Sequence, residues 1–497
     1  MGQELLRLQN GSDVRGVAIA AEQEDITLSK ENAYAIARSF GRWVKKQSPN
    51  KKEKYVATVG MDSRLSGPML KGAVMYGLAA EGFHVYDAAL SSTPAIFMST
   101  VFEEIQADCG VMITASHLPA NRNGMKFFTR AGGTNKQDIR EILLDAEQTS
   151  IERETCNIFP LNLTKRYADH LTSIIREQTG KKYPFTGCKM IVDAGGGAGG
   201  FFADILNELG ADTSGSLFLE PDGTFSGHIP NPENASVLTD FSRQVKEQQA
   251  ELGIIFDTDV DRAAVVDKGG HIIARNALIA LMTLIVLKDS KQKPTIVTDS
   301  VTSSSLKEFI EKKGAVHHRF KRGYKNVIDE AIRLNATGVY APLAIETSGH
   351  GALMENYFLD DGAYMAVKIL ILYASLMEEG KSLSDLLKDF EEAKEAEELR
   401  MYIECEDFQT CGNRALEAFA DYAQKQSGWK IETPNYEGVR IQADEQSGEG
   451  WALMRLSLHD PEMVINIESR QNGGVAKIKE HIFEALKPFE DIRQKTK

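Results

Sequence analysis

Three carboxylates in one short loop give the strongest chemical signal in the sequence. Asp257, Asp259 and Asp261 alternate directly after the apolar run 252–256, and Arg262 follows them. Oxygen ligands at such spacing suit a hard divalent cation, and without a compensating positive charge the carboxylates would repel one another. An EF-hand is excluded because the loop has no Gly at its sixth position and no Glu at its twelfth. Arg262 beside such a site could stabilise charge on a transferring phosphoryl group.

Two further loops carry polar side chains of complementary types. Ser116, with His117 beside it and Lys126 ten residues on, could be a nucleophile or a phosphate carrier. A capped turn explains the same Ser and Pro residues equally well. Residues 346–350 place a carboxylate, a hydroxyl and an imidazole around a glycine, which suits a loop that reads a polyhydroxylated ligand. An ordinary turn remains the alternative for this loop.

A glycine-rich stretch, 193–200, satisfies the pattern G-x-G-x-x-G after an apolar run and before a helical pattern. A dinucleotide site also requires an acidic residue about 20 positions on, at the end of a second strand. Asp212 is near that distance but lies in the turn-like sequence 210–215. The stretch therefore favours a tight strand-to-helix turn, with a nucleotide-dependent oxidoreductase as the alternative.

Short apolar runs alternate with amphipathic stretches along most of the chain. We expect strands at 55–59, 111–114, 190–192, 252–256, 295–298 and 339–341. This alternation is typical of an α/β fold with parallel or mixed sheets, in which ligands bind at the carboxyl ends of the strands. The charged stretch 378–400 reads as a solvated helix and connector. The last hundred residues, with a helix at 411–427 and three strands after it, predict an α+β cap.

The overall composition narrows the functional class. The chain has 497 residues, and its 57 Lys and Arg against 71 Asp and Glu give a net charge of −14. This disfavours a nucleic-acid-binding protein and adhesion to anionic membranes. No apolar run is long enough to span a membrane, and no secretory leader is evident. Five scattered cysteines favour reduced thiols, so we expect a cytoplasmic protein, with a mature organellar protein as the alternative.

Taken in order, these loops resemble the α-D-phosphohexomutases, a family of phosphoglucomutases, phosphomannomutases and phosphoglucosamine mutases. The resemblance covers nearly the whole chain. It comprises a D-x-R-G element ending at Gly16, a G-x-D-x-R-x-S loop at 60–66, a phosphoserine-type loop at 114–119 followed by 123–126, a P-D-G-x-F…P-N-P stretch at 221–232, a D-x-D-x-D-R magnesium loop at 257–262, a K-x-G contact at 321–324, a sugar loop at 346–350 and a terminal phosphate loop at 451–461.

The resemblance implies four domains around a central cleft, three α/β domains with mixed sheets and a smaller C-terminal α+β cap. The expected boundaries are 1–165 with the phosphoserine loop, 166–270 with the metal loop, 271–395 with the sugar loop and 396–497 with the phosphate-binding cap. It also implies a mutase that interconverts hexose 1-phosphate and hexose 6-phosphate through a phosphoserine and a 1,6-bisphosphate intermediate, of phosphomannomutase/phosphoglucomutase type. The expected cofactors are Mg²⁺ and an activator of the glucose 1,6-bisphosphate type.

The same resemblance implies roles for individual residues. The implied catalytic residues are Ser116, His117, Lys126, Arg15 and Arg262. The implied metal ligands are Ser116, through its phosphate, Asp257, Asp259 and Asp261. The implied substrate-binding residues are Arg64, Lys321, Gly323, Tyr324, Glu346, Ser348, His350, Arg455, Ser457 and His459. The expected partner is a small sugar phosphate, with no nucleic acid and no membrane, and the expected state is a monomer or homodimer.

The terminal phosphate loop departs most from the family pattern. Leu458 stands where glycine would permit close approach of the backbone to phosphate. His459 stands in place of Thr and could donate to phosphate with a pH-dependent affinity. Leu118, Ile345 and Ser12 are smaller departures. These changes keep open a phosphoglucosamine or phosphopentose mutase, or a catalytically weakened protein that binds sugar phosphates.

Overall fold

The computed structural model describes residues 4–22, 24–48, 52–150, 158–457 and 460–494. The chain divides into two compact units, each built from two segments. The first unit comprises Met1–Ala274 and Ser348–Asp385, and the second comprises Arg275–Thr347 and Leu386–Lys497.

The first unit begins with an eight-stranded mixed sheet in the order β1-β2-β6-β5-β3-β4-β8, with β7 paired to β6. Strands β5, β3, β4 and β8 run parallel, whereas β2 and β6 are antiparallel to their neighbours. The elements are η1 (Leu5–Leu8), β1 (Gln9–Asn10), β2 (Asp13–Val17), α1 (Lys30–Gln47), β3 (Tyr55–Met61), α2 (Gly67–Ala80), β4 (Phe83–Leu90), α3 (Thr93–Met98), β5 (Cys109–Ile113), β6 (Arg122–Thr129), β7 (Gly132–Gly133), α4 (Lys136–Ala146), β8 (Ile158–Pro160) and α5 (Leu163–Thr179).

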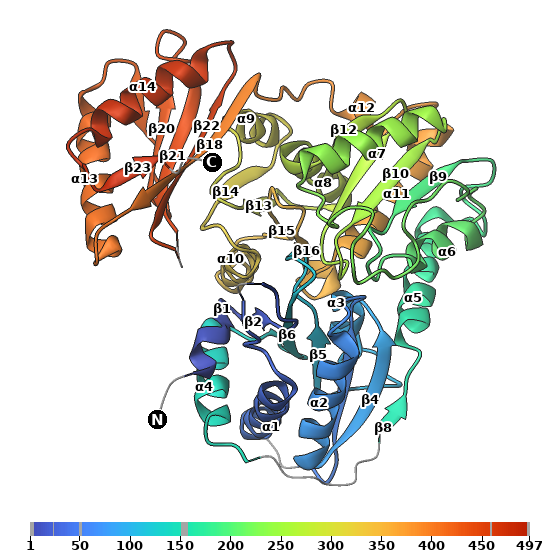
Figure 1. Cartoon of the computed structure of the whole chain (residues 1–497). Helices are drawn as coiled ribbons and strands as arrows, with labels where there is room; N and C mark the ends of the chain where they lie inside the picture. Colours follow the sequence, from blue (N-terminus) through green and yellow to red (C-terminus); the bar gives the residue numbers. More distant parts are fainter. Residues whose placement is uncertain (1–3, 23, 49–51, 151–157, 458–459, 495–497) are drawn as a thin grey trace. The chain divides into compact units, whose positions relative to one another are not determined.

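Helix α1 packs between α4 and α2 and covers this sheet (Figure 1). Its start is set by Ser29, whose side chain accepts a hydrogen bond from the backbone N–H of Asn32. Its buried side recurs at helical spacing, through Ile36, Phe40 and Val44. The central strand β5 is buried along its whole length, as expected of a parallel strand covered on both faces.

The contact between α1 and α2 depends on one glycine, which gives a stability test. A Cβ at Gly77 of α2 would lie 2.6 Å from the carbonyl oxygen of Tyr34 and 2.9 Å from Cβ of Ala37, both in α1. Gly77→Ala is therefore expected to destabilise the protein by about 1–3 kcal/mol through overpacking. Gly72 in the same helix has nothing within 4 Å of such a Cβ, so Gly72→Ala is expected to stabilise by about 1 kcal/mol. Thermal unfolding measures both, and equal effects would contradict the packing argument.

The rest of the first unit carries a four-stranded sheet in the order β12-β11-β10-β9. Strand β10 runs parallel to β9 and antiparallel to β11. Helix α11 packs against α5 and against this sheet. The elements are β9 (Met190–Asp193), α6 (Phe201–Glu208), α7 (Ala235–Glu247), β10 (Leu252–Phe256), β11 (Ala263–Asp267), β12 (His271–Ile273), β16 (Gly351–Leu353), η2 (Met354–Asn356), β17 (Leu359–Asp360), α11 (Gly362–Glu378) and α12 (Leu383–Leu386).

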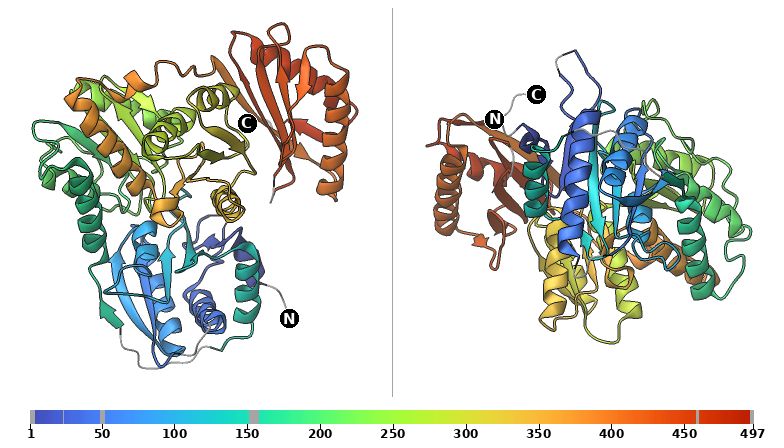
Figure 2. Two further views of the ribbon diagram at one scale, coloured as in Figure 1. Left: turned by 180° about the vertical axis from the view of Figure 1, so that it is seen from behind. Right: turned by 90° about the horizontal axis from the view of Figure 1, so that it is seen from below.

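The second unit combines a parallel sheet, in which β13 lies between β14 and β15, with an antiparallel C-terminal sheet in the order β19-β20-β21-β22-β18-β23. Helices α13 and α14 lie together on one face of the C-terminal sheet (Figure 2). The elements are α8 (Arg275–Asp289), β13 (Thr295–Thr298), α9 (Ser304–Lys312), β14 (Val316–Arg319), α10 (Tyr324–Ala336), β15 (Leu343–Ile345), β18 (Glu395–Ile403), α13 (Phe408–Lys425), β19 (Trp429–Ile431), β20 (Val439–Ala443), β21 (Gly450–Leu456), β22 (Glu462–Ser469), α14 (Gly474–Leu486) and β23 (Ile492–Gln494).

The predicted α/β class with mixed sheets and a C-terminal α+β part is confirmed, whereas two local predictions are wrong. The strand expected at 339–341 lies instead at β15, because the Asn335 side chain bonds both backbone groups of Ala341. The helix expected within 378–400 is reduced to the four residues of α12 (Leu383–Leu386), and the stretch then continues into β18. There Leu399, Met401 and Ile403 are buried at alternate positions, a period of two that the high charge of the stretch obscured.

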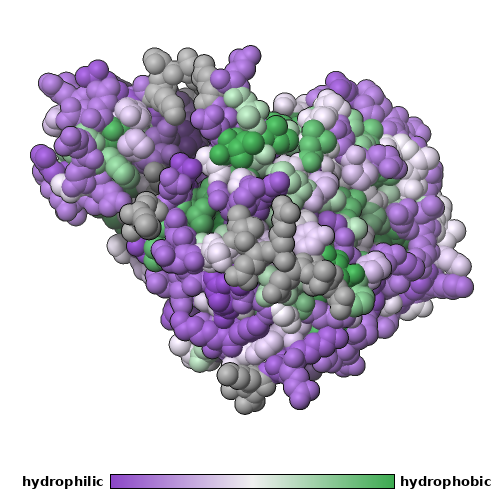
Figure 3. Space-filling model, turned by 60° about the horizontal axis from the view of Figure 1, so that its bottom comes forward, coloured by the Kyte–Doolittle hydropathy of each residue, from purple (hydrophilic) through white to green (hydrophobic). Residues whose placement is uncertain are grey.

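The cysteines and the surface complete the description. Cys405 and Cys411 form a disulfide, so the expectation of reduced thiols is wrong for this pair; Cys109 and Cys188 are free and buried, and Cys156 lies outside the described residues. Within the described ranges, no helix is long and apolar enough to cross a membrane. Hydrophilic side chains cover most of the face seen in Figure 3, with apolar ones in separate patches.

Candidate functional site

The loop after β5 holds Ser116 in a fixed and unusual backbone conformation. Ser116 is 2% exposed and has a φ of 50°, in the left-handed region. Its backbone N–H donates to Oγ1 of Thr114 over 2.9 Å, and that hydroxyl donates to Oδ2 of Asp62 over 2.7 Å. Strained backbone of this kind persists only where the surroundings over-determine it. The loop is therefore held by buried contacts to its backbone.

Arg64 supplies most of that support. Its side chain is fully buried, and its guanidinium donates to the carbonyl oxygens of Ser116, Leu118, Pro119 and Arg122 over 2.5–2.9 Å. Burial raises the pKa of Asp62, its carboxylate partner, to about 6, although Arg64 opposes that rise. Arg64 thus binds backbone carbonyls of the serine loop. We propose that it positions this loop, in place of the expected contact with substrate.

The second loop, after β10, brings three carboxylates to the Ser116 hydroxyl. Asp257, Asp259 and Asp261 are almost wholly buried, and each offers one oxygen within 4.8 Å of the others. The Ser116 hydroxyl donates to Oδ2 of Asp257 over 2.7 Å. Nη2 of Arg262 lies 3.1 Å from that hydroxyl oxygen, and Nε of Arg262 lies 3.1 Å from Oδ2 of Asp257. The serine and the carboxylates therefore form one cluster, although Ser116 and Asp257 are 141 positions apart in the chain.

The charges of this cluster suit a divalent cation. Lys126 donates to Oδ2 of Asp259 over 2.8 Å and to Oδ2 of Asp261. Burial and the neighbouring Asp261 raise the pKa of Asp257 well above its usual range. The pKa of Asp261 is lowered despite its burial, because Lys126 and Arg262 lie beside it. Oδ1 of Asp259 and Oδ1 of Asp261 are buried and have no hydrogen-bond partner among the described residues. Oxygen ligands of this type are those that Mg²⁺ prefers.

Two histidines lie beside the same cluster. Nδ1 of His117 is 3.4 Å from the Ser116 hydroxyl, and burial, reinforced by Arg262 and Arg15, lowers the pKa of His117 to about 3. His350 bonds to the Ser348 hydroxyl over 2.8 Å through Nδ1, and its Nε2 lies 3.7 Å from Oδ1 of Asp261. Burial also lowers the pKa of His350 well below its usual range. Both imidazoles are therefore neutral near pH 7.

The first unit thus brings together most of the residues expected at a transfer centre. They are Arg15, Ser116, His117, Lys126, Asp257, Asp259, Asp261, Arg262, Ser348 and His350. Arg15 pairs with Asp13 over 3.0 Å at the edge of this group. Arg64 also belongs to the first unit, and the remaining expected residues belong to the second unit.

Within the second unit, Glu346 fastens the expected sugar loop to the K-x-G turn. Its Oε1 accepts the backbone N–H of Gly323 over 2.6 Å, at the turn where Lys321 is exposed and Tyr324 begins α10. The next residue, Thr347, donates its hydroxyl to the buried Asp299 over 2.8 Å. The carboxylate of Glu346 is therefore held at a defined position beside this turn.

Arg455 occupies the C-terminal part of the same unit. It is 9% exposed, its Nε has no hydrogen-bond partner among the described residues, and burial lowers its pKa. Its Nη1 lies 4.0 Å from Glu437, which also accepts hydrogen bonds from the Ser300 hydroxyl and the Arg322 N–H. Ser457 follows at the end of β21, where its N–H donates to the Glu462 carbonyl. His459 and Leu458 lie outside the described residues.

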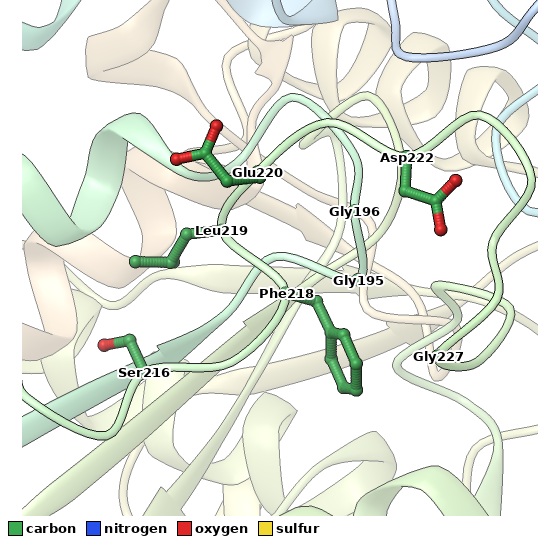
Figure 4. A pocket seen from close by; sticks show the side chains of 8 residues that line it. All are labelled: Gly195, Gly196, Ser216, Phe218, Leu219, Glu220, Asp222 and Gly227. Carbon is green, nitrogen blue, oxygen red and sulfur yellow. The ribbon is translucent and has the colours of Figure 1, made fainter.

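The glycine-rich stretch forms a strand-to-helix turn beside a cavity of about 360 Å³ (Figure 4). The N–H groups of Gly196 and Gly197 donate to the carbonyls of Phe218 and Ala194, so both are used within the protein. Glu220 and Asp222, both acidic, line the cavity. These features disfavour the phosphate of a dinucleotide, and the turn interpretation accounts for the glycines.

Two contacts to the cluster were not foreseen from the sequence. Thr93, at the start of α3, donates its hydroxyl to Oδ2 of Asp259 over 2.5 Å. Asn231 accepts a hydrogen bond from Nη1 of Arg262 over 3.3 Å. Asn231 lies in the P-N-P stretch, so the resemblance pointed to its loop although not to its contact. Thr93 belongs to no recognised motif, and no local pattern marks it.

Comparisons with known proteins match this chain to one family over most of its length. Family models of phosphoglucomutase/phosphomannomutase α/β/α domains I, II and III match residues 6–153, 165–270 and 274–393. A phosphomannomutase/phosphoglucomutase of Pseudomonas syringae pv. tomato is 30% identical over 94% of this chain and 92% of its own length. A phosphoglucomutase/phosphomannomutase of Thermococcus kodakarensis is 30% identical over 96% and 97%. A crystal structure of a phosphoglucomutase/phosphomannomutase family protein from Burkholderia thailandensis has a TM-score of 0.79 at 26% identity, covering 99% of this chain and all of that one.

Proposed function

Since this chain belongs to the phosphoglucomutase/phosphomannomutase family, and is therefore a phosphohexomutase, we propose that Ser116 is the residue that carries its phosphoryl group. The observation that supports this role is the position of the Ser116 hydroxyl. It donates to Asp257 and lies 3.1 Å from Arg262, so a negative group attached there would lie beside a buried guanidinium. Arg is well suited to phosphate because its charge is permanent and its donors form a planar fork.

The carboxylates would hold one Mg²⁺. Asp257, Asp259 and Asp261 are its proposed ligands, since their oxygens gather within 4.8 Å and one oxygen each of Asp259 and Asp261 has no hydrogen-bond partner among the described residues. When bound, Mg²⁺ supplies positive charge that offsets the charge developing on a transferring phosphoryl group. Lys126 and Arg262 lie at the same cluster and act on the same charge.

Transfer exchanges one ester bond for another. A hydroxyl oxygen of the hexose monophosphate attacks phosphorus, the bond from phosphorus to the Ser116 Oγ breaks, and the proton of that hydroxyl passes through a nearby base to the released Ser116 oxygen. Nδ1 of His117 lies 3.4 Å from the serine oxygen, so His117 is a candidate to pass this proton on, with Lys126 and Arg15 stabilising the transferred group. The resulting 1,6-bisphosphate returns its other phosphate to Ser116, which completes the isomerisation.

We assign the sugar and the distal phosphate to residues of three other loops. Glu346, Ser348 and His350 are proposed to contact sugar hydroxyls, and Lys321, Gly323, Tyr324, Arg455, Ser457 and His459 to contact the sugar phosphate. Support for the phosphate site comes from Arg455, a buried guanidinium whose Nε has no partner among the described residues. We also propose four domains with boundaries near residues 165, 270 and 395, and a bisphosphate activator of the glucose 1,6-bisphosphate type.

Two measurements on the purified protein test this function. Intact-mass analysis is expected to show an adduct of one phosphoryl group. Coupled assays with glucose 1-phosphate and mannose 1-phosphate, a trace of the matching 1,6-bisphosphate and Mg²⁺ are expected to show turnover, with glucosamine 1-phosphate and ribose 1-phosphate as comparison substrates. Preference for the glucosamine or pentose phosphate would identify the protein as a phosphoglucosamine or phosphopentose mutase instead. Absence of turnover on all four would contradict the assigned machinery.

A further inference from the structure

Thr93 makes two hydrogen bonds to one residue, Asp259, of the loop 257–262. Its hydroxyl donates to Oδ2 of Asp259 over 2.5 Å, and its backbone N–H donates to the carbonyl oxygen of Asp259 over 2.9 Å. The two residues are 166 positions apart in the chain, and both are buried, with Thr93 2% exposed and Asp259 fully enclosed. One residue thus fixes both the backbone and the side chain of Asp259.

The surroundings of Thr93 leave its side chain little freedom. The hydroxyl of the preceding Ser92 accepts the N–H of Ala95 and caps α3, and the N–H of Ser91 donates to the carbonyl of Met61 at the end of β3. All residues from 91 to 98 are buried. A β-branched side chain has few χ1 rotamers, so the hydroxyl of Thr93 has a defined direction.

The Thr93 hydroxyl determines which carboxylate oxygen of Asp259 remains without a hydrogen bond. Oδ2 accepts from both Thr93 and Lys126, whereas Oδ1 is buried without a hydrogen-bond partner among the described residues. A buried carboxylate oxygen without a partner is costly and marks a position where a ligand would satisfy it. Partners of this kind orient the residues that bind a metal and tune their affinity.

We propose that Thr93 is a positioning residue for the divalent cation, which it serves by holding Asp259 with Oδ1 turned toward the ion. The inference rests on the proposed cation site at the three aspartates. Lys126 cannot replace Thr93 in this role, because its ammonium is shared between Asp259 and Asp261 and sits on a long flexible stem. The Thr93 hydroxyl is neutral, so it orients the carboxylate without opposing the charge of the cation.

The test compares variants of Thr93 by their affinity for Mn²⁺ and Mg²⁺ in the metal-free full-length protein. Thr93→Val keeps the shape and the backbone N–H bond to Asp259 but removes the hydroxyl, and Thr93→Ser keeps the hydroxyl. Thr100→Val is the matched control, since Thr100 is equally buried in the same segment and its hydroxyl donates to the Phe97 carbonyl. Mn²⁺ binding is followed by electron paramagnetic resonance, and Mg²⁺ by competition against Mn²⁺.

Thr93→Val is expected to weaken binding of both cations by about 10–100-fold, whereas Thr93→Ser and Thr100→Val bind within about threefold of the unaltered protein. The Mg²⁺ concentration for half-maximal mutase rate should rise by the same factor in Thr93→Val, and saturating Mg²⁺ should restore most of the rate. If Thr93→Val does not fold, Thr93→Ala, which also lacks the hydroxyl, is measured in its place.

Three results would overturn the inference. They are unchanged affinity in Thr93→Val, an equal loss in Thr100→Val, and no recovery of affinity in Thr93→Ser. Failure of the unaltered protein to bind Mn²⁺ or Mg²⁺ would instead remove the proposed cation site, and the inference with it. Binding by the unaltered protein together with unchanged affinity in Thr93→Val would overturn the role of Thr93 alone.

Discussion

Ser116→Ala is expected to lower mutase activity by on the order of 10³-fold or more, since alanine has no oxygen to which a phosphoryl group can be esterified. The phosphoryl adduct in the intact-mass spectrum should disappear in the same variant. The fold should change little, because the contacts that hold the serine loop run through backbone groups. These include the Ser116 N–H to Thr114 and the Ser116 carbonyl to Arg64. The coupled assay and the mass spectrum together give the result.

Ser99→Ala is the matched control for this variant. Ser99 is also fully buried, and its hydroxyl donates to the carbonyl of Ile96, away from the cluster of carboxylates. It should keep both the phosphoryl adduct and most of the activity. If Ser116→Ala retained the adduct, another residue would carry the phosphate. If it retained full activity without an adduct, the reaction would proceed without a phosphoenzyme.

Arg64→Met is expected to give the largest loss of stability, about 3–5 kcal/mol. Removing one partner of a buried ion pair leaves the other charge uncompensated, and Asp62 lies fully buried 3.3 Å from Nε of Arg64. Three carbonyl oxygens of the serine loop and that of Arg122, at the start of β6, would also lose a charged donor. The measurement is the shift of the urea midpoint of the unfolding transition of the first unit, followed by tryptophan fluorescence and circular dichroism.

The loss in Arg64→Met should depend on pH in a defined direction. Burial raises the pKa of Asp62 to about 6 in the folded protein, above the ordinary value of 3.8. Without Arg64, which lowers that pKa, it should rise further. A carboxyl whose pKa is raised by folding stabilises the folded state fully at pH values below its pKa in the unfolded chain. This stabilisation is lost as the pH rises through its pKa in the folded protein. The variant should therefore lose least stability, relative to the unaltered protein, near pH 4 and most above pH 6.

Arg166→Met serves as the control for Arg64. The Arg166 side chain is 37% exposed and pairs with Glu104 at the surface, where such pairs contribute little. The free energy of unfolding of Arg166→Met should fall by less than about 1 kcal/mol. If Arg64→Met had unchanged stability and a raised KM for sugar phosphate, the positioning role would be contradicted. Arg64 would then be assigned to substrate binding, as the family resemblance implies.

Much of the site was predictable because its residues are adjacent in the chain. Asp257, Asp259 and Asp261 alternate within five positions, and the strand before them was predicted at its observed bounds, 252–256. A strand end followed by a polar loop is a local pattern, so it is readable without knowing what lies opposite. The order of the remaining loops then indicated the family.

Local patterns failed where a side chain or strand outside the pattern changed the outcome. Residues 339–341 have the composition of a strand, but the Asn335 side chain bonds the backbone groups of Ala341, so the strand begins at Leu343, four positions after its expected start. The charged residues around β18 suggested a solvated helix, while the burial of its alternate positions depends on the neighbouring strand β22. The deciding partner was a side chain of the preceding helix α10 in the first case and a strand far away in the chain in the second.

The sequence by itself determined the fold class, the family and the identity of the chemical groups, because these depend on residue types and their local spacing. Only the tertiary structure decided which atoms meet. It joined the Ser116 hydroxyl to Asp257 across 141 positions and Thr93 to Asp259 across 166, and it turned Arg64 toward the backbone of the serine loop. Such contacts depend on how separately formed strands and helices pack, and packing between distant segments leaves no periodic or local trace in the sequence.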